Sequence, residues 1–519
     1  MGWEPELEEL QRRHELAAQL GGAEGVARQR SLGKLTVVER LERLADRDSF
    51  RGFGRLRGTA SYDDEGNLES VLPHAQIEGR CRIDGRDVIV TAGDFTVRGG
   101  SGGVNHGALG VELSAAERAH EWRLPYVRLL DAAGGSVRGF EEIGRTYLPD
   151  GNAFTTVDFE LLNRVPVVSA VLGAAAGLPA VHAVLAHFNV MTEQNAFVFP
   201  GGPPVVRAAT GAEVTKEELG GPHIHVGQSG TVDNLAVDEA DALDQVRRFL
   251  SYLPSSVDEM APRVPTDDPV DRCDERLAEV VPRNPRQTFD PRRIIDAVVD
   301  RGSFFEIAPR YGRARVTGLA RIDGYPVGVM ANDPRRLGGA TDVAAGSKAA
   351  RLIQLCDTFH LPLIDFADEP GLMVGIESER QGIERAGARL VGTLVASRMP
   401  YLVFVVRRLY GVGGQSHHRA SGMFRRYAWP SASWGSMHIA GGTSAAYRRE
   451  IEAAEDPEAM RLQIEARLQR LASPQRTAES TGQDIIDPRH CRPLAVEFLH
   501  DAQRVLALQL GEPPYRYLP

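Results

Sequence analysis

Lysine and cysteine are both scarce in this sequence. Only three of its 519 residues are lysines, namely Lys34, Lys216 and Lys348. The four cysteines are scattered along the chain, and no two of them form a Cys-x-x-Cys pair. Structural zinc sites and disulfide frameworks need closely spaced or paired cysteines, so the sequence argues against both.

Long apolar runs and an excess of positive charge are missing too. No segment approaches the roughly 20 apolar residues that cross a bilayer. The N-terminus, Met1 to Glu6, is acidic and lacks the basic and apolar regions of a signal peptide. The net charge of -10 disfavours nucleic acid as a partner. We therefore expect a cytoplasmic protein that binds neither membranes nor nucleic acids.

Familiar catalytic signatures are also absent. The sequence has no Walker loop and no His-Glu-x-x-His motif. Glycine clusters remain, at Gly134-Gly135 and at Gly411, Gly413 and Gly414. Glycines between a strand and a helix leave main-chain N–H groups pointing outward, where two of them can hold an oxyanion. On the glycines alone, a plain tight turn is the simpler interpretation.

The chain contains one pattern twice. Arg-Ile-Asp-Gly occurs at residues 82–85 and again at 321–324. Further matches follow in the same order, with offsets that drift by a few residues as loops of unequal length require. The matched positions include Asp46 with Asp300, Leu124-Pro125 with Leu361-Pro362, Asp131 with Asp368, Gly134 with Gly371, and Gly177 with Gly411. Ordered echoes of this kind predict an internal duplication.

Each copy predicts the same succession of elements. The expected elements are strands at 88–90 and 327–330, helices at 110–122 and 344–359, and strands at 126–130 and 363–366. Alternating strands and helices are typical of α/β folds with crossover connections. Seven prolines lie within residues 252–291, which indicates a linker. We expect an N-terminal domain (1–255), a Pro-rich linker (256–290) and a C-terminal domain (291–519).

Several ordered segments resemble a single family. They are Gly33-Lys34-Leu35-Thr36, Glu39-Arg40, Gly93 to Ser101, Thr210 to Gly221, Lys348 to Arg351, Asp368 to Leu372 and Ala428-Trp429-Pro430. With them, the chain resembles the carboxyltransferase (β) subunits of biotin-dependent acyl-CoA carboxylases, of the propionyl-CoA and methylcrotonyl-CoA type. The resemblance implies an α/β fold of two tandem crotonase-like domains related by internal duplication. It also implies an active site where the first domain of one subunit meets the second domain of another.

The resemblance places the acyl-CoA in the N-terminal domain. There Gly134 and Gly135 would be the catalytic donors that stabilise the thioester enolate. Gly99, Gly100 and Ser101, in a loop similar to the family's Asp-Phe-Thr-Val-x-Gly-Gly-Ser, would bind the substrate.

The resemblance places biotin in the C-terminal domain. Gly414, Gln415 and Ser416 would be the catalytic segment that faces the urea oxygen of biotin. Gly371 and Gly413 would bind biotin together with Gly414.

The sequence departs from the family pattern in two places. The usual Asp-Ser-Gly-Gly-Ala-Arg is replaced by residues 131–138, which keep the glycine pair, and the usual Tyr-Gly-Gly-Ala-Tyr-Asp by the longer segment 410–418. His417 and His418 then lie where the acyl tail would be sensed. Either they bind a polar acyl group as substrate-binding residues, or they lie on a helix surface or behind the site.

We expect four further histidines to have structural roles, linking parts of the chain in or near the first-domain site. They are His182, His187, His223 and His225. Their spacing is not that of a zinc site on one helix, and we expect no metal.

The sequence context of the three lysines indicates whether this chain itself carries biotin. None of the three lies in the Met-Lys-Met context of a biotinylated lysine, and no ATP-grasp-like loop is visible. The resemblance therefore implies a separate biotin carboxylase and biotin carrier subunit, with coenzyme A as part of the substrate. It also implies a homo-oligomer, a hexamer built as a trimer of dimers.

Carboxyl transfer from carboxybiotin to an acyl-CoA is thus the function that the resemblance implies. A decarboxylase or transcarboxylase of the same fold, and a catalytically silent scaffold paralogue in a carboxylase complex, are the alternatives. A standalone crotonase-type hydratase fits less well, because it would need one domain and a pair of acidic bases.

Overall fold

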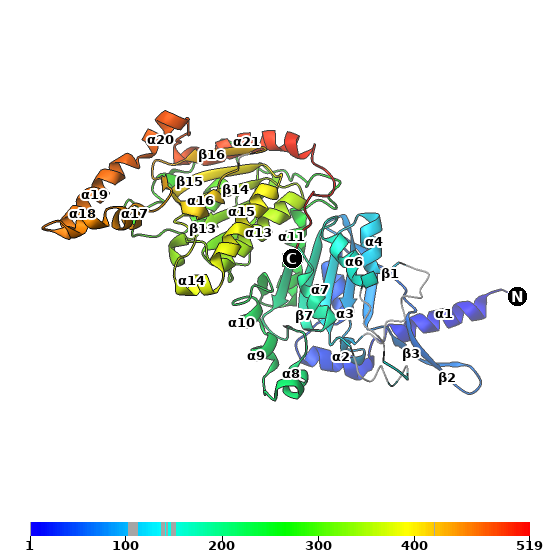
Figure 1. Cartoon of the computed structure of the whole chain (residues 1–519). Coiled ribbons are helices and arrows are strands. Elements are labelled where there is room, and N and C mark those ends of the chain that lie inside the picture. The colour runs from blue at the N-terminus through cyan, green and yellow to red at the C-terminus, as the bar shows by residue number, and fades with distance from the viewer. Residues whose placement is uncertain (1, 102–112, 136–140, 142–143, 147–151, 420) are drawn as a thin grey trace. The chain divides into compact units, whose positions relative to one another are not determined.

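The computed structural model describes residues 2–101, 113–135, 141, 144–146, 152–419 and 421–519. The chain divides into two units, Met1–Val257 with Leu518–Pro519, and Asp258–Tyr517. Each unit has its own sheet with flanking helices (Figure 1). From Asp258 onward the Pro-rich stretch belongs to the second unit, where Leu277 is buried in the core.

The first unit is built around an eight-stranded mixed sheet. Its strands in spatial order are β1 (Arg51–Phe53), β4 (Gln76–Ile83), β5 (Arg86–Gly93), β6 (Tyr126–Ala132), β7 (Val167–Ala176), β8 (Phe188–Thr192) and β10 (Asn234–Ala236), with β9 (Phe197–Phe199) on β7. The pairs β1–β4 and β4–β5 are antiparallel, and every later pair is parallel. A separate hairpin joins β2 (Gly58–Tyr62) to β3 (Leu68–Pro73).

The second unit repeats this topology in a seven-stranded sheet. Its strands are β11 (Phe305–Ile307), β12 (Arg315–Ile322), β13 (Tyr325–Asn332), β14 (Leu363–Glu369), β15 (Tyr401–Tyr410) and β16 (Phe424–Ala428), with β17 (Ser433–Gly435) on β15. Again the first two pairs are antiparallel and the rest are parallel. The matching strand order confirms that the sequence repeat is a repeat of fold.

The duplication extends to single hydrogen bonds. The repeated Asp-Gly forms a two-residue turn with positive φ at both positions, 51° at Asp84 and 81° at Gly85, as tight hairpins favour. Asp46 accepts both turn amides, at 3.0 Å from Asp84 and 2.8 Å from Gly85. Asp300 holds the amides of residues 323–324 at the same two distances.

Both sheets are irregular at one equivalent place. The β6–β7 ladder shifts register between Leu130 and Ala132, and the β14–β15 ladder shifts between Ala367 and Glu369. Such irregularities bend the strand and turn the chain away from the ladder. In each unit the chain then enters the glycine loop that was predicted from the sequence.

The described helices of the first unit are α1 (Glu4–Ala17), α2 (Gly22–Ser31), α3 (Val37–Leu44), α4 (Ala115–Trp122), α6 (Asn152–Leu161), α7 (Leu178–Val184), α8 (Pro203–Thr210), α9 (Lys216–Gly220), α10 (Pro222–His225) and α11 (Glu239–Ser251). Of these, α4, α7 and α11 pack against strands of the sheet. The helix expected over 110–122 begins at Ala115, because Ser114 and Glu117 form a capping box. Residues 110–112 of that prediction lie outside the described residues.

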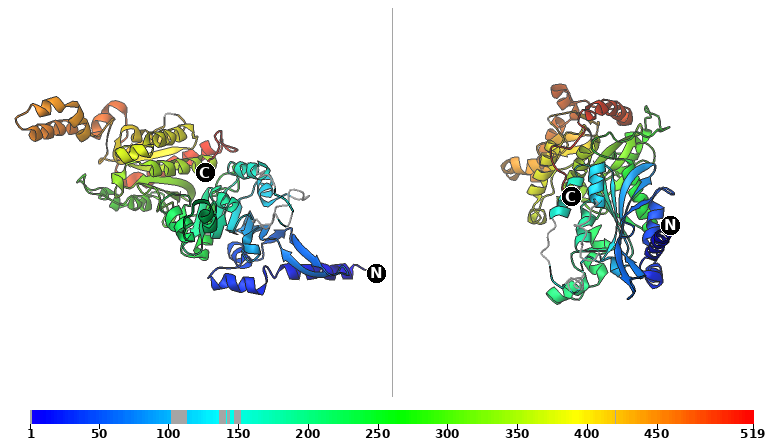
Figure 2. Two further views of the ribbon diagram at one scale, coloured as in Figure 1. Left: turned by 60° about the horizontal axis from the view of Figure 1, so that its bottom comes forward. Right: turned by 90° about the vertical axis from the view of Figure 1, so that its right-hand side faces the viewer.

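The second unit has its own set of helices. They are α12 (Arg292–Val298), α13 (Val343–Thr358), α14 (Ile376–Arg380), α15 (Ile383–Ala396), α16 (Gly411–Gln415), α17 (Ile439–Ala446), α18 (Arg448–Glu452), α19 (Pro457–Leu471), α20 (Pro474–Thr481) and α21 (Cys491–Leu506). The helix expected over 344–359 is α13, which Asp342 caps. Figures 1 and 2 show α17 to α20 as an arm that extends away from the second sheet. Within the described ranges, no helix combines the length and apolarity needed to cross a bilayer.

Candidate active site

The first glycine site, formed by Gly134 and Gly135, follows directly on β6. Gly134 has φ of 78°, and a Cβ there would lie 2.4 Å from the carbonyl oxygen of Ala176, so only glycine fits. Gly135 is exposed, and a Cβ on it would meet nothing within 4 Å. Neither glycine amide donates a hydrogen bond to any of the described residues. The loop therefore presents two N–H donors that no described residue accepts, and open space adjoins Gly135.

The predicted substrate loop supports this site from behind. The Ser101 hydroxyl donates to the carbonyl of Gly134 at 2.8 Å, and the amide of Ala133 donates to Gly99 at 3.1 Å. At Gly100, a Cβ would lie 2.4 Å from the Asp131 carbonyl oxygen. The structure thus brings Gly99, Gly100 and Ser101 together with the glycine pair, and their contacts hold that loop in place. Ser136 to Arg138, the end of the segment 131–138 that replaces the family motif, lie outside the described residues.

A buried ion cluster anchors the first site. Asp131, in β6, accepts hydrogen bonds or ion pairs from Lys34 at 2.6 Å, Arg40 at 3.0 Å and Gln29 at 3.2 Å. Arg40 is also paired with Glu239 at 2.7 Å. Burial lowers the pKa of Lys34 even though the charge of Asp131 opposes that shift. Sequence reasoning did not assign this cluster, although Lys34 and Arg40 belong to the motifs that carried the family resemblance.

The second glycine site, formed by Gly371, Gly413 and Gly414, brings two segments together. Gly371 follows β14 with φ of 126°, and Gly413 lies in α16 after β15. A Cβ on Gly413 would lie 3.0 Å from the Cα of Gly371, so the two backbones are in contact. The N–H groups of the first helical turn have no acceptor inside α16. The structure therefore brings the predicted biotin-binding residues together.

The first unit has the same juxtaposition. A Cβ on Gly134 would approach the Ala176 oxygen, and a Cβ on the equivalent Gly371 would lie 3.8 Å from the Tyr410 oxygen. Gly177 follows Ala176 with φ of 67° and leads into α7, as Gly411 with φ of 62° begins α16. Gly177 thus adjoins the first site, a role that sequence reasoning missed although the repeat had matched it to Gly411.

Ser416 turns back toward Gly413, and His417 lies behind the site, which is one of the two positions expected for that histidine. The amide of Ser416 donates to the Gly413 carbonyl at 3.1 Å, and its hydroxyl donates to the same oxygen at 2.7 Å. Ser416 is 1% exposed and His417 is 0% exposed. An engaged amide cannot also hold an oxyanion, and a ligand cannot reach a fully buried ring. The available donors lie one turn earlier, and His417 belongs to the group behind the site.

Gln415 and His418, in contrast, are exposed. The His418 ring packs edge-on against Phe424 with 5.0 Å between centroids. Partial burial, followed by the charge of Arg426, lowers the pKa of His418. Its imidazole is therefore neutral near pH 7. These two side chains, of the four predicted at the end of the segment, remain accessible to a ligand.

A cluster of polar side chains lies behind the second glycine site. Its members are each at most 1% exposed and are Arg315, Asn332, Thr341, Asp365, Glu369, Tyr401 and His417. Burial would raise the pKa of Glu369, but hydrogen bonding to His417 and the charge of Arg315 outweigh it and lower that pKa to about 2. Burial likewise opposes protonation of His417, yet the adjacent Asp365 raises the pKa of the imidazole overall. Both carboxylates are therefore held beside cationic partners.

The other predicted histidines have structural contacts. His187 is buried and accepts the amide of Val167 at 3.0 Å, while its second nitrogen lies 2.9 Å from the Leu162 oxygen. His225 lies 2.7 Å from the Val198 oxygen. His223 contacts Gln228, and His182 is paired with Asp158 at 3.1 Å. No group of three or more potential metal ligands occurs in the described part of the chain.

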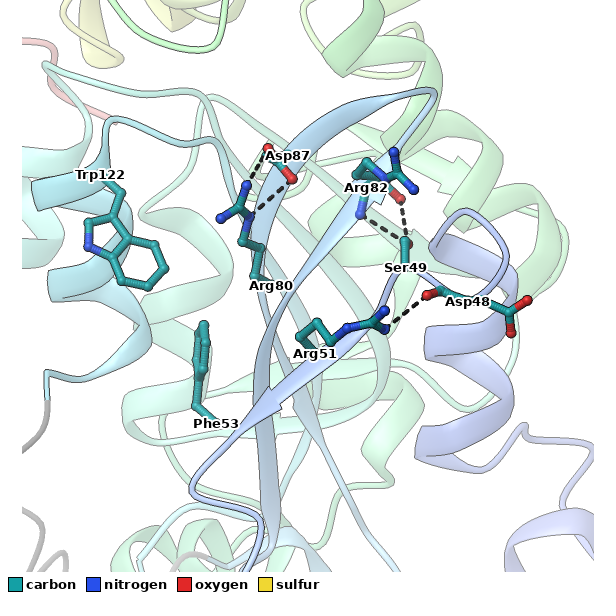
Figure 3. Close-up of a pocket in the computed structure, with 8 residues that line it drawn as sticks. All are labelled: Asp48, Ser49, Arg51, Phe53, Arg80, Arg82, Asp87 and Trp122. Carbon is teal, nitrogen blue, oxygen red and sulfur yellow. Dashed lines mark hydrogen bonds and ion pairs between the residues drawn. The ribbon is translucent and has the colours of Figure 1, made fainter.

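A separate hollow of about 380 Å³ lies on the first unit (Figure 3). Its lining residues are Asp48, Ser49, Arg51, Phe53, Arg80, Arg82, Asp87 and Trp122. Asp87 stands near the start of β5, whereas Gly93 at the end of β5 approaches Asp131 and the first glycine site. The hollow therefore lies at the opposite end of the sheet from the candidate chemistry.

Comparison with known proteins decides the family. The model described as "Carboxyl transferase domain" matches residues 28–504. The chain belongs to the carboxyl transferase domain family. Its two units are the tandem crotonase-like domains of this carboxyltransferase fold.

Individual carboxyltransferases resemble the chain over nearly its full length. It is 36% identical to the carboxyltransferase subunit of propionyl-CoA carboxylase from Haloferax mediterranei, over 95% of both chains. It is 33% identical to the biotin-dependent acetyl-/propionyl-CoA carboxylase beta5 subunit of Mycobacterium tuberculosis, covering 98% of this chain and 93% of the relative. A crystal structure of transcarboxylase 12S, described as a hexamer with methylmalonyl-CoA bound, superposes with a TM-score of 0.86 at 30% identity, covering 97% and 96%. The protein is a carboxyltransferase of the biotin-dependent acyl-CoA carboxylase, decarboxylase and transcarboxylase group.

Proposed function

We propose that this chain is the carboxyltransferase subunit of an acyl-CoA carboxylase and transfers a carboxyl group from carboxybiotin, carried on a separate protein, to an acyl-CoA. One observation carries the proposal. Each duplicated unit offers a glycine-built main-chain site at the carboxyl end of an equivalent parallel strand, β6 in one and β14 in the other. The family relationship supplies the class of substrates.

The first glycine site suits a thioester oxygen. When an acyl-CoA exchanges its α-proton for a carboxyl group, negative charge develops on the thioester oxygen. The amides of Gly134 and Gly135, which donate to no residue in the described ranges, can donate to that oxygen. Loss of one such donor typically weakens transition-state binding by about 2.7–4 kcal/mol. Gly135 leaves open space for the substrate, and Ser101 fixes the loop from behind.

The second glycine site suits the urea oxygen of biotin. Its donors are main-chain N–H groups, and Gly371, Gly413 and Gly414 place no side chains over them. When bound, carboxybiotin supplies the activated carboxyl group, while the chain's amides hold and orient the urea oxygen. Gln415 and His418 are the exposed side chains that can narrow the site and select the acyl group.

Partner and assembly belong to the same proposal. None of the three lysines lies between methionines, which supports a biotin carrier and biotin carboxylase on separate chains. The related transcarboxylase 12S structure is described in terms of hexamer assembly and of substrate binding to a multienzyme core, which supports a hexamer here.

A panel assay tests the proposal. The purified chain is combined with its biotinylated partner, ATP, bicarbonate and a series of acyl-CoAs, and we expect carboxylation of at least one of them. Gly135→Ala adds a methyl group to the open space of the first site and should lower kcat/KM by about 10²-fold or more. The matched control is Gly392→Ala in α15, where a Cβ also meets nothing within 4 Å and activity should persist. Equal activity of the two variants would contradict the role of Gly135.

Decarboxylation or transcarboxylation is the second candidate, because the related 12S structure is a transcarboxylase and the same donors serve both directions. It is favoured if no acyl-CoA is carboxylated while free biotin promotes loss of CO₂ from methylmalonyl-CoA. Activity in neither assay would leave the scaffold paralogue.

A further inference from the structure

The cluster behind the second glycine site connects both of its walls. On one side, Glu369 Oε1 accepts the amide of Gly371 at 3.0 Å. Its other oxygen, Oε2, accepts from Arg315 at 2.8 Å, Asn332 at 3.0 Å and Thr341 at 2.5 Å. The carboxylate is thereby fixed by four donors, and the position of Gly371 follows from it.

On the other side, His417 and Tyr401 hold the end of α16. The His417 Nδ1 lies 2.5 Å from Asp365, and its Nε2 lies 3.6 Å from Glu369. The Tyr401 hydroxyl lies 2.7 Å from Asp365 and 3.0 Å from the carbonyl oxygen of Ser416. Imidazole and phenol thus tie the segment after Gly414 to two carboxylates of β14.

The charges explain why this connection is stiff. The cluster sets the carboxyl groups of Asp365 and Glu369 against the guanidinium of Arg315 and the imidazole of His417, whose Nε2 also lies 3.4 Å from Arg315. None of these groups has water to replace a lost partner, since each is at most 1% exposed. Removing one member of such a buried set leaves an uncompensated charge, which the structure relieves by moving.

We propose that His417 and Glu369 are positioning residues that fix the separation between Gly371 and Gly413 and so keep the second glycine site in shape. This inference rests on the proposed function of that site. Neither residue touches a ligand; they act through the main chain on either side of it.

Kinetics with separate substrates test the inference. The full chain is assayed for decarboxylation of methylmalonyl-CoA with free biotin as the probe. His417→Gln should lower kcat/KM for biotin by about 10²-fold, the effect of a displacement near 1 Å, while the KM for methylmalonyl-CoA stays at the wild-type value. The control is His500→Gln, because His500 is also paired with an aspartate of the second unit, Asp323 at 2.9 Å, but is 54% exposed.

Two conservative variants separate positioning from general damage. Glu369→Gln keeps an oxygen for the Gly371 amide and should lose less activity than Glu369→Ala. The double variant Asp365→Asn/His417→Gln replaces a charged pair by a neutral one and should recover part of the loss seen in His417→Gln. An active wild type whose His417→Gln variant keeps its kcat/KM for biotin overturns the inference, as does an equal rise in both KM values.

Hydrogen exchange gives a readout that does not need activity. Exchange of amides in residues 370–374 and 411–418 should rise together in His417→Gln and remain unchanged in His500→Gln. If the wild type proves inactive with every substrate while this paired rise is seen, the proposed function fails and the positioning role stands. If exchange rises in neither segment, the positioning role fails.

Discussion

Lys34 and Asp131 form an ion pair of 2.6 Å inside the first unit, where Lys34 is 7% exposed and Asp131 is 0% exposed. Asp131 lies in β6 three residues before Gly134, so the pair joins the N-terminal segment to the first glycine site. A buried pair of this kind depends on both members, because removing one leaves a charge without compensation.

Replacing Lys34 by methionine should therefore destabilise the protein. We expect the free energy of unfolding to fall by about 3 kcal/mol or more, measured by urea denaturation, because Asp131 then keeps Arg40 and Gln29 as its side-chain donors among the described residues. Lys216→Met is the matched control, since Lys216 is exposed and its loss should change stability by at most about 0.5 kcal/mol. Identical midpoints for the two variants would show that Lys34 is dispensable.

Neighbouring glycines of α16 should respond differently to alanine. A Cβ on Gly413 would lie 2.9 Å from the Gly371 carbonyl carbon, whereas one on Gly414 would be at an ordinary 3.5 Å from its nearest neighbours. Gly413→Ala should push the two segments apart and lower carboxyltransferase activity by about 10²-fold. Gly414→Ala should keep a wild-type melting temperature in thermal denaturation. Its activity is measured in the same assay as that of Gly413→Ala. A fully active Gly413→Ala would contradict the close contact.

The loss of folding stability at acid pH should depend on Glu369. Its pKa is lowered from 4.5 to about 2, so the folded state favours the ionised carboxylate. That contribution is present above pH 4.5 and is lost as the pH falls from 4.5 to about 2, on the order of 3 kcal/mol in total. Glu369→Gln should flatten the pH dependence of unfolding in this window. If the stability of the variant falls as steeply as that of the wild type in this pH window, Glu369 is not the group responsible.

The two equivalent turn acceptors should not be equally important. Asp300 is 4% exposed and also pairs with buried Arg492 at 2.8 Å, whereas Asp46 lies 3.7 Å from a partly exposed Arg247. Asp300→Asn should lower the free energy of unfolding by about 3 kcal/mol. Asp46→Asn should lower it by about 1 kcal/mol, the usual contribution of hydrogen bonds at a surface turn. Equal losses in urea titrations would show that burial around Asp300 adds nothing.

The internal repeat could be predicted because the motifs that reveal it are short segments of adjacent residues. An Asp-Gly turn requires positive φ at two successive residues, and that requirement is written in adjacent positions of the sequence. Glycines 134 and 371 were placed for the same reason, since each is needed where a strand ends and two backbones approach. The predicted strands end too early, by two residues for β6 and by three for β14, because the last residues of both strands are polar or small and give no apolar signal.

The direction of the Ser416 and His417 side chains could not be predicted in this way. The two residues stand two and three positions after Gly414, and that closeness in sequence left contact with a ligand open for both. In the structure a turn after α16 points Ser416 back to Gly413 and His417 inward to Asp365. The partner carboxylates come from another strand, so no local pattern could have revealed the direction.

The sequence by itself determined the duplication, the α/β class, the glycine loops and the family, because turn chemistry, hydrophobic runs and motifs are properties of short segments. Only the tertiary structure decided which groups stand behind those loops. Lys34 meets Asp131, and His417 meets Asp365 and Glu369, across long separations in the chain. Buried charges must find partners wherever folding brings them, and that choice depends on how strands pack rather than on the order of residues.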